Sequence, residues 1–169
     1  MKIVFLDIDG VLNHQEFYRA KRAAGTDKTS REIDDIDPSK VALLNKLHLE
    51  TNCEFVISST WRLGRTPEDL QKILDHHGFT GKVVDVTPRG KCGHRGCEIQ
   101  EWLQHHRAFT GAWSSDYKEY VILDDDSDML MWQMGNYINV DQEVGITNTT
   151  IYKAIRILTG VTPLMVVTY

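Results

Sequence analysis

Short apolar runs, each followed by polar residues, recur along the chain. Four of them are rich in valine and isoleucine and nearly continuous in apolar character, and a weaker fifth follows; they cover residues 2–6, 54–58, 82–86, 120–123 and 137–140. Runs of this length and composition are typical of parallel strands that are covered on both faces. The pattern therefore predicts a parallel sheet of about five strands.

Between these runs, the apolar residues recur with helical spacing. The expected helices begin after Asp37, run from Thr66 to about Gly78, and cover about 97–106 and 149–158. A proline follows each of the first two caps, as is common at the first position of a helix. Strands that alternate with helices predict an α/β, doubly wound, Rossmann-like fold with helices on both faces of the sheet.

Two polar stretches interrupt this alternation, at about 13–36 and 87–96. Both follow strands, so we expect them at the carboxyl edge, where open α/β sheets bind ligands. Each is too short to fold as a separate cap domain. The sequence predicts a single domain over 1–169, with a short polar insertion at 13–36 and an open site. The apolar end of the chain, 161–169, suits a sixth strand or an interface.

Composition and charge narrow the classes of protein. The chain of 169 residues has a net charge of -5, which argues against broad electrostatic binding to nucleic acid but leaves room for a local basic patch. Three cysteines provide no disulfide framework. No apolar run approaches the roughly 20 residues of a membrane span. We expect a soluble, cytoplasmic protein.

Carboxylates directly follow two of the expected strands. Asp7 and Asp9 end the first in FLDIDGVLN, and Asp124 and Asp125 end the fourth in YVILDDDSD. Two carboxylates so close together repel each other, and burial adds to that cost. Both strands end at the same edge of the sheet, and Mg²⁺ prefers carboxylate and carbonyl oxygens. The pattern therefore predicts a magnesium site.

Two further positions suit a phosphoryl group. Ser58 directly follows the apolar run EFVI, with Ser59 as the alternative register, and either hydroxyl could donate to a phosphate oxygen. Arg95 lies at the expected start of a helix, where a cation and the helix N-terminus both favour an anion. Lys91 and Arg89 are the alternatives for this cationic role.

The order of these motifs resembles the haloacid dehalogenase (HAD) superfamily of phosphotransferases. The stretch DIDGV at 7–11 is similar to the first motif of that superfamily. Ser58 and Arg95 are placed like its second and third motifs, and Asp124 and Asp125 are placed like its fourth. Within the superfamily, SSTWR, RGCEIQEWL and LDDDSDM together resemble HAD domains associated with RNA-repair proteins.

The resemblance implies a Mg²⁺-dependent phosphatase, a hydrolase of phosphate monoesters. Asp7 would be the nucleophile that forms an aspartyl-phosphate, and Asp9 would be the general acid and base. The metal would be held by Asp7, the backbone carbonyl of Asp9 and Asp124, with Asp125 close by or acting through water. The second acid, Asp9, favours a phosphatase because an alcohol leaving group needs a proton.

The resemblance also assigns the phosphoryl contacts. They would come from Gly10, Arg95 and Ser58, or from Ser59 in the alternative register. Trp61 and Arg62 follow the serines on the same edge and are candidate substrate contacts. Packing and surface charge account for these two residues equally well.

The open site and its basic surroundings suggest a class of substrate. Members of the superfamily without a cap tend to act on the ends of macromolecules. Five basic residues are expected near this edge: Arg19, Lys21, Arg22, Arg62 and Arg65. A nucleic-acid terminal phosphate or a nucleotide is therefore the leading expectation, with a phosphoprotein as an alternative. The alternative function is a non-catalytic HAD-like module that binds a phosphorylated ligand or a partner.

Other residues invite a second metal site or a larger first one. Cys92, His94 and Cys97 crowd together but lack the paired spacing of zinc sites, so we expect them to be unliganded. Asp126 and Asp128 would either begin a helix, where acids favour the helix dipole, or, for Asp128, join the metal site.

Overall fold

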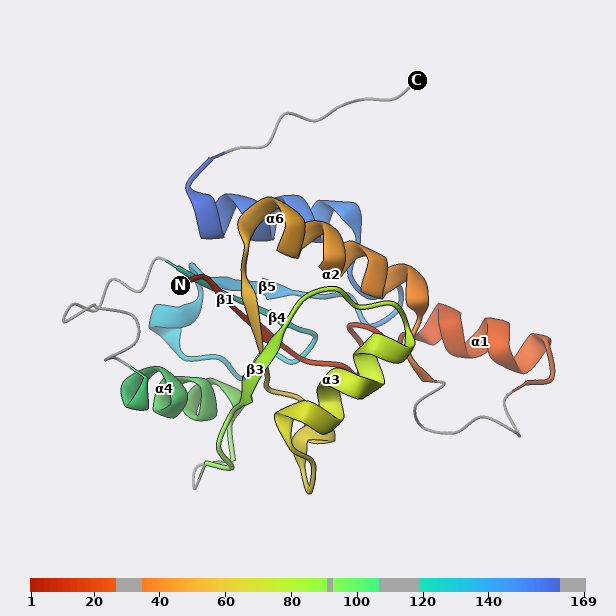
Figure 1. Cartoon of the computed structure of the whole chain (residues 1–169), viewed down its shortest axis with the longest axis horizontal. Helices are drawn as coiled ribbons and strands as arrows, with labels where there is room; N and C mark the ends of the chain where they lie inside the picture. The colour runs from red at the N-terminus through yellow and green to blue at the C-terminus, as the bar shows by residue number, and fades with distance from the viewer. Residues whose placement is uncertain (27–34, 91–92, 107–118, 162–169) are drawn as a thin grey trace.

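The computed structural model describes residues 1–26, 35–90, 93–106 and 119–161. Its centre is an all-parallel sheet in the spatial order β3-β2-β1-β4-β5 (Figure 1). The strands are β1 (Ile3–Leu6), β2 (Glu54–Ile57), β3 (Val83–Val86), β4 (Tyr120–Asp124) and β5 (Tyr137–Asn139). All five predicted strands are confirmed, and the apolar runs are buried most completely in the three central strands.

Helices cover both faces of the sheet, as predicted for a doubly wound fold. They are α1 (Gln15–Ala23), α2 (Pro38–Thr51), α3 (Pro67–His76), α4 (Arg95–His105) and α6 (Asn148–Thr159), with short 3-10 helices η3 (Thr60–Arg62) and η4 (Met131–Gln133). Buried residues of α2, α3 and α6 share one core cluster with the sheet. Those of α4 form a second cluster on the opposite face. Figure 1 shows α2 and α6 side by side above the sheet and α4 below it.

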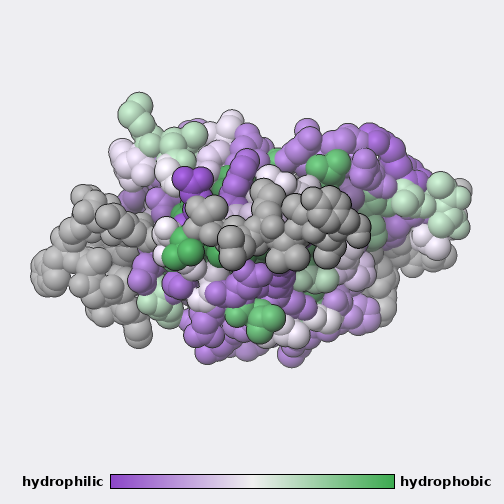
Figure 2. All heavy atoms as spheres, turned by 90° about the horizontal axis from the view of Figure 1, so that it is seen from above, coloured by the Kyte–Doolittle hydropathy of each residue, from purple (hydrophilic) through white to green (hydrophobic). Residues whose placement is uncertain are grey.

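The outer side of the α2 and α6 layer is polar. Seen from above, the visible described surface is mostly hydrophilic, with isolated apolar side chains (Figure 2). Single exposed apolar residues are common on protein surfaces, and Leu49, 85% exposed, is one of them. No helix in the described ranges is long and apolar enough to cross a membrane.

The alternation of side chains along the strands places the site on the α4 face. Phe5 of β1, Val56 of β2 and Ile122 of β4 all pack in the cluster that contains α4 residues. Because strand side chains repeat every two residues, the next residues on this face are those that end the three strands. The face that α4 covers therefore receives the polar residues at the carboxyl edge.

Local capping explains where the predicted helices begin. The Asp37 side chain accepts a hydrogen bond from the backbone of Ser39, and Thr66 forms a reciprocal capping box with Asp69. The third predicted helix begins at Arg95, two residues earlier than the expected start at about residue 97. The expected boundaries are otherwise close to those observed.

Helix α1 was not predicted. It lies in the polar insertion, buries none of its residues, and is made mostly of polar and charged side chains, so few apolar residues mark it in the sequence. His14 holds its start instead: the ring accepts a hydrogen bond from the backbone of Phe17 and lies 3.0 Å from Asp37 Oδ2. The C-terminal stretch for which a sixth strand or interface was expected lies outside the described residues, apart from its first residue, Val161.

Candidate active site

The carboxyl edge brings the predicted motifs into one row. The strand register sets β1, β2 and β4 level at their ends, so Asp7, Ser58 and Asp124 lie next to one another across the sheet. All three are buried, with exposed fractions of 4%, 0% and 0%. Asp7 and Asp124, which lie 117 positions apart in the sequence, thus meet through strand pairing. The placement of two acidic clusters at strand ends predicts this proximity.

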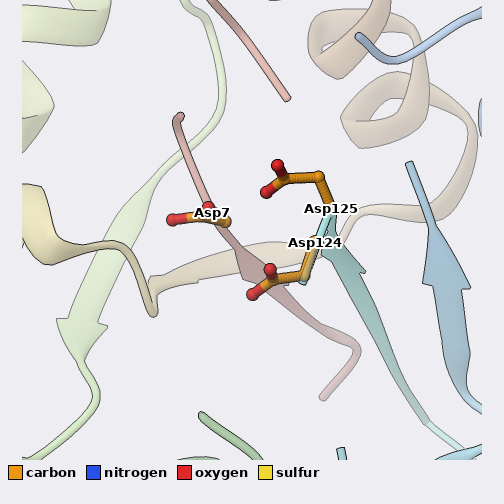
Figure 3. Close-up of side chains that lie close together, drawn as sticks. All are labelled: Asp7, Asp124 and Asp125. Carbon is orange, nitrogen blue, oxygen red and sulfur yellow. The ribbon is translucent and has the colours of Figure 1, made fainter. Parts of the chain in front are cut away.

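Three carboxylates form the centre of the site. Asp7 follows β1, Asp124 ends β4 and Asp125 follows it, and Figure 3 shows the three side chains close together at this edge. Each offers an oxygen atom, and these atoms lie within 4.8 Å of one another. Within the described ranges this is the group of acidic, histidine or cysteine side chains whose spacing suits a metal ion.

Burial and mutual repulsion raise the pKa values of these carboxyl groups. Burial, followed by the charge of Asp7, raises the pKa of Asp124 to about 8. Burial also raises the pKa of Asp7, against the opposing effects of the Arg95 guanidinium and the Ser59 hydroxyl. Burial and then Asp7 raise the pKa of Asp125. A bound cation would counter this repulsion, since an opposite charge favours the ionised form.

The donor set fits a divalent cation. One oxygen of Asp7, Oδ1, and one of Asp124, Oδ2, are buried and accept no hydrogen bond. Buried polar atoms without a hydrogen bond are uncommon and costly, and a bound cation would satisfy both of these oxygens. Carboxylate oxygens are the ligands that hard cations take. The three aspartates could therefore hold a metal at this edge.

Gly10 allows Asp125 to reach this cluster. Its backbone φ is 70°, a value that glycine adopts at little cost. A Cβ atom at this position would lie 2.3 Å from Asp125 Oδ2, much closer than any real contact. The phosphate contact expected at Gly10 stays a prediction, and close approach of Asp125 is a second reason for glycine here.

Arg95 supplies the cation of the row. As the first residue of α4, it places Nη1 3.6 Å from Asp7 Oδ1 and Nε 3.4 Å from Asp124 Oδ2. Burial lowers the pKa of Arg95, but the neighbouring carboxylates, Asp7 foremost, outweigh this effect and raise it. Arg89, one alternative, is exposed and outside these contacts, and Lys91, the other, lies outside the described residues.

Asp128 holds the start of α4. Its Oδ2 accepts a hydrogen bond of 2.8 Å from the backbone nitrogen of Arg95, which is one of the donors left free at the helix start. The expectation that Asp126 and Asp128 begin a helix of their own is wrong, because the chain after β4 continues as an irregular loop. Asp128 instead serves the N-terminus of a helix about 33 residues earlier in the chain.

Both serines of the predicted second motif are fully buried. The Oγ of Ser58 has no hydrogen-bond partner. The Oγ of Ser59 accepts a bond of 3.4 Å from the backbone of Trp61, and its hydroxyl lowers the pKa of Asp7, although burial prevails. Ser58 therefore keeps an uncommitted hydroxyl beside Asp7, and the preference for Ser58 over Ser59 stays a prediction with this support.

Asp9 lies apart from the three clustered carboxylates. Its side chain is exposed, and Oδ1 accepts hydrogen bonds from Asn13 Nδ2 at 2.8 Å and from Trp61 Nε1 at 3.1 Å. The side-chain amide oxygen of Asn13, Oδ1, in turn accepts a hydrogen bond of 2.9 Å from the backbone N–H of Gly10. Trp61 is only 7% exposed, so it orients Asp9 from within the protein. Sequence reasoning missed Asn13, which lies in the same turn as the motif.

Arg62 is buried rather than presented to solvent. It is 8% exposed, and its guanidinium binds protein atoms at four positions. The sequence suggested a substrate contact here, with packing as the alternative, and the observed contacts favour a role inside the protein. A mostly buried side chain can still act on the site through the groups it holds.

Two basic residues on α1 form ion pairs with acids. Arg19 forms an ion pair with Glu143, and Lys21 forms one with Asp35. These contacts reduce the positive charge that α1 offers to a nucleic acid. The zinc alternative is not tested, because Cys92 lies outside the described residues; His94 is 66% exposed.

Comparison with known proteins agrees with this geometry. A family model described as "HAD domain in Swiss Army Knife RNA repair proteins" matches residues 3–151. No curated protein and no solved structure matches the chain. The match covers all five strands and the start of α6, including both acidic motifs, the serines and Arg95. The chain therefore belongs to the HAD superfamily, in the family of HAD domains found in Swiss Army Knife RNA repair proteins.

Proposed function

We propose that this protein is a Mg²⁺-dependent phosphomonoesterase that works through an aspartyl-phosphate on Asp7. The observation that carries the proposal is the buried row of Asp7, Ser58 and Asp124, with Arg95 beside it. A nucleophile, a free hydroxyl donor and a fixed cation meet there on one face of the sheet. Membership of the HAD superfamily, whose members are generally hydrolases, supports the same chemistry.

In the first half of the reaction, Asp7 attacks the phosphorus atom of the ester. A bond forms between the Asp7 carboxylate oxygen and phosphorus, and the bond from phosphorus to the alcohol oxygen breaks. Asp9 gives a proton to that oxygen, so the substrate leaves as an alcohol. Ser58 and Arg95 donate hydrogen bonds to the phosphoryl oxygens and stabilise the charge that develops on them.

In the second half, water removes the phosphoryl group from Asp7. Asp9, now ionised, takes a proton from the attacking water. A bond forms between the water oxygen and phosphorus, and the bond between phosphorus and Asp7 breaks. Inorganic phosphate leaves, and both carboxyl groups return to their starting protonation states. General acid and base assistance of this kind contributes about 10²- to 10⁴-fold in rate.

The metal would be held by Asp7, Asp124, Asp125 and the backbone carbonyl of Asp9. When bound, it supplies positive charge that offsets the repulsion between nucleophile and phosphoryl group. Asp7 Oδ1 and Asp124 Oδ2 accept no hydrogen bond, and this free acceptor capacity supports the ligand set. The raised pKa of Asp124, caused by burial and then by Asp7, adds support.

A nucleic-acid end or a nucleotide is the proposed substrate class. The matched family is described as a HAD domain in RNA repair proteins. The ends of a broken RNA strand can carry phosphate monoesters. The exposed position of Asp9 supports a leaving group that extends into solvent, as an oligonucleotide would. The ion pairs of Arg19 and Lys21 limit the basic surface beside the site, so we expect contacts to the terminal nucleotides more than to a long duplex.

Phosphate release from p-nitrophenyl phosphate, measured with Mg²⁺ and with EDTA, tests the reaction. The proteins compared are the wild type, Asp7→Asn and a control variant, Asp126→Asn. Asp126 is exposed in the acidic loop that follows β4, and its replacement by asparagine removes one negative charge, as Asp7→Asn does. We expect activity only with Mg²⁺, lost in Asp7→Asn and kept in the control. Oligonucleotides phosphorylated at the 5′ or 3′ end, compared with mononucleotides, then define the substrate.

The alternative function, a module that binds phosphorylated ligands without turnover, gives a different result. Under it, the wild type would release no phosphate from any of these substrates, and Asp7→Asn would bind a phosphorylated oligonucleotide as tightly as the wild type does. Burial of Asp7 beside the free hydroxyl of Ser58 favours the enzyme.

A further inference from the structure

Arg62 fixes three backbone carbonyls around the proposed phosphoryl site. Its Nη1 donates to the carbonyl oxygens of Ser58 and Ser59, at 2.9 and 2.8 Å. Its Nε donates to the carbonyl oxygen of Thr87 at 2.9 Å. Ser58 directly follows β2 and Thr87 directly follows β3, so a single side chain joins the ends of two neighbouring strands.

Glu98 completes this arrangement from the opposite side. Its Oε2 accepts a hydrogen bond of 2.6 Å from Arg62 Nη2, and its Oε1 accepts the backbone N–H of Gly90 at 3.1 Å. Glu98 is 7% exposed and lies in the first turn of α4, three residues after Arg95. The ion pair therefore ties the serine loop to the helix turn that carries the active-site cation.

We propose that Arg62 and Glu98 are positioning residues that hold Ser58 and Arg95 at the spacing needed to bind a phosphoryl group. The proposal rests on the proposed function, since it assigns these two residues to the same site. Neither of them would touch the substrate. They act through the carbonyl of Ser58 and through the first turn of α4, and so preorganise two donors that come from different elements.

The shape of the guanidinium explains why arginine stands at this position. Its planar fork directs several N–H donors outward at fixed angles, and a buried lysine ammonium cannot reach the same set of acceptors. Glu98 also balances the charge of Arg62 within the protein. Because the charge of Arg62 is paired in this way, Arg95 is the cation that remains for the site among the described residues that contact Asp7.

Arg62→Lys and Glu98→Gln test the proposal. Arg62→Lys keeps the positive charge and Glu98→Gln keeps the side-chain size, so both disturb the buried pair less than a truncation would. The matched controls are Arg156→Lys, an exposed arginine on α6, and Glu101→Gln, three residues after Glu98 on α4. The probes are Mg²⁺ alone and inorganic phosphate in the presence of Mg²⁺, both measured by calorimetry, together with kcat and KM for p-nitrophenyl phosphate.

We expect phosphate affinity to fall about 10- to 100-fold in Arg62→Lys, because small misplacements of binding groups have effects of this size. We expect Mg²⁺ affinity to stay unchanged. We expect a smaller loss in Glu98→Gln and none in the controls. A residue needed only for stability would lower the melting temperature and leave phosphate affinity intact in the folded protein, which would overturn the proposal.

Failure of the proposed function would look different. If the wild type released no phosphate from any substrate but bound inorganic phosphate, Arg62→Lys would still have to weaken that binding for the positioning role to stand. If Arg62→Lys did not fold, the loss of phosphate affinity in Glu98→Gln relative to Glu101→Gln would decide the question. Equal affinities in those two variants would overturn the positioning role.

Discussion

The indole nitrogen of Trp61 donates hydrogen bonds to both carboxylate oxygens of Asp9, at 3.1 and 3.2 Å. Trp61 comes from η3, after β2, and Asp9 from the turn after β1. The proposed acid is therefore oriented by a buried side chain from a neighbouring strand end.

Replacing Trp61 with phenylalanine removes this donor and keeps most of the buried ring. We expect kcat for p-nitrophenyl phosphate to fall about 10-fold, part of the contribution of a positioned acid and base, with little change in KM. Trp132→Phe is the control, since Trp132 is 67% exposed. Equal kcat values for the two variants would contradict the orienting role of Trp61.

The stability of the metal-free protein should depend on pH through the clustered carboxylates. Burial and then Asp7 raise the pKa of Asp124 from its ordinary 3.8 to about 8. The folded state therefore binds more protons than the unfolded state between these values, and the free energy of unfolding falls as pH rises through this window. Below the lower value, the contribution is fully present.

Thermal unfolding in EDTA across this range, for wild type and Asp124→Asn, checks the sign. We expect the wild type to lose melting temperature as pH rises toward about 8, and Asp124→Asn to lose less, because it cannot ionise at this position. Saturating Mg²⁺ should reduce the loss in the wild type, since a ligand that binds the folded state stabilises it. A wild type that gains stability relative to Asp124→Asn as pH rises would contradict the account.

Gly10→Ala should disturb the metal site as well as the backbone. Its added Cβ would meet Asp125 Oδ2 at 2.3 Å, in addition to the strain of a positive φ. Gly25→Ala is a matched control, because Gly25 has the same φ of 70° and no atom within 4 Å of the added Cβ. Strain of this kind costs on the order of 1–3 kcal/mol.

Both glycine variants should therefore lose stability, but only Gly10→Ala should also bind Mg²⁺ more weakly. Calorimetric titration with Mg²⁺, with the unfolding free energy from urea denaturation, separates the two effects. Unchanged Mg²⁺ affinity in Gly10→Ala would show that Asp125 is not needed at its observed position.

Asp128→Ala should loosen the start of α4. Its carboxylate accepts the backbone N–H of Arg95, and loss of a cap costs about 0.5–2 kcal/mol. We expect a comparable loss of unfolding free energy and weaker binding of inorganic phosphate, because the helix turn that carries Arg95 is less well held. Asp126→Ala, on the same loop, should change neither quantity. Identical phosphate affinities in the two variants would argue against this role.

Much of the fold could be predicted from the sequence because local pattern and global fold agree. The valine- and isoleucine-rich runs became the five strands, and Asp37 and Thr66 cap helices as expected. Helix α1 was missed because it buries no residue. Its residues are mostly polar, and its start is held by polar contacts such as those of His14, so few apolar residues mark this helix in the sequence.

The candidate site also contains residues that the sequence predicts and residues that it does not. Residues at strand ends could be predicted, because parallel strands deliver their ends to one edge, and Asp7, Ser58 and Asp124 do lie there. The partners of these residues could not, since Arg62 and Trp61 could serve as well on the surface as in the interior. Only the packed structure shows that one holds backbone carbonyls and the other holds Asp9.

The most direct test of the central claim is to locate the phosphoryl group on the protein. Asp9→Asn, which should slow hydrolysis of the intermediate, would be mixed with p-nitrophenyl phosphate in Mg²⁺, quenched in acid and analysed by peptide mass spectrometry. The nitrophenolate of this substrate leaves without a proton from Asp9, so the intermediate can still form in the variant. The account predicts one added phosphoryl group on Asp7, and none in Asp7→Asn or in EDTA. Phosphate release by the wild type with the label on another residue, or with no label on Asp7 in the trapped variant, would contradict it.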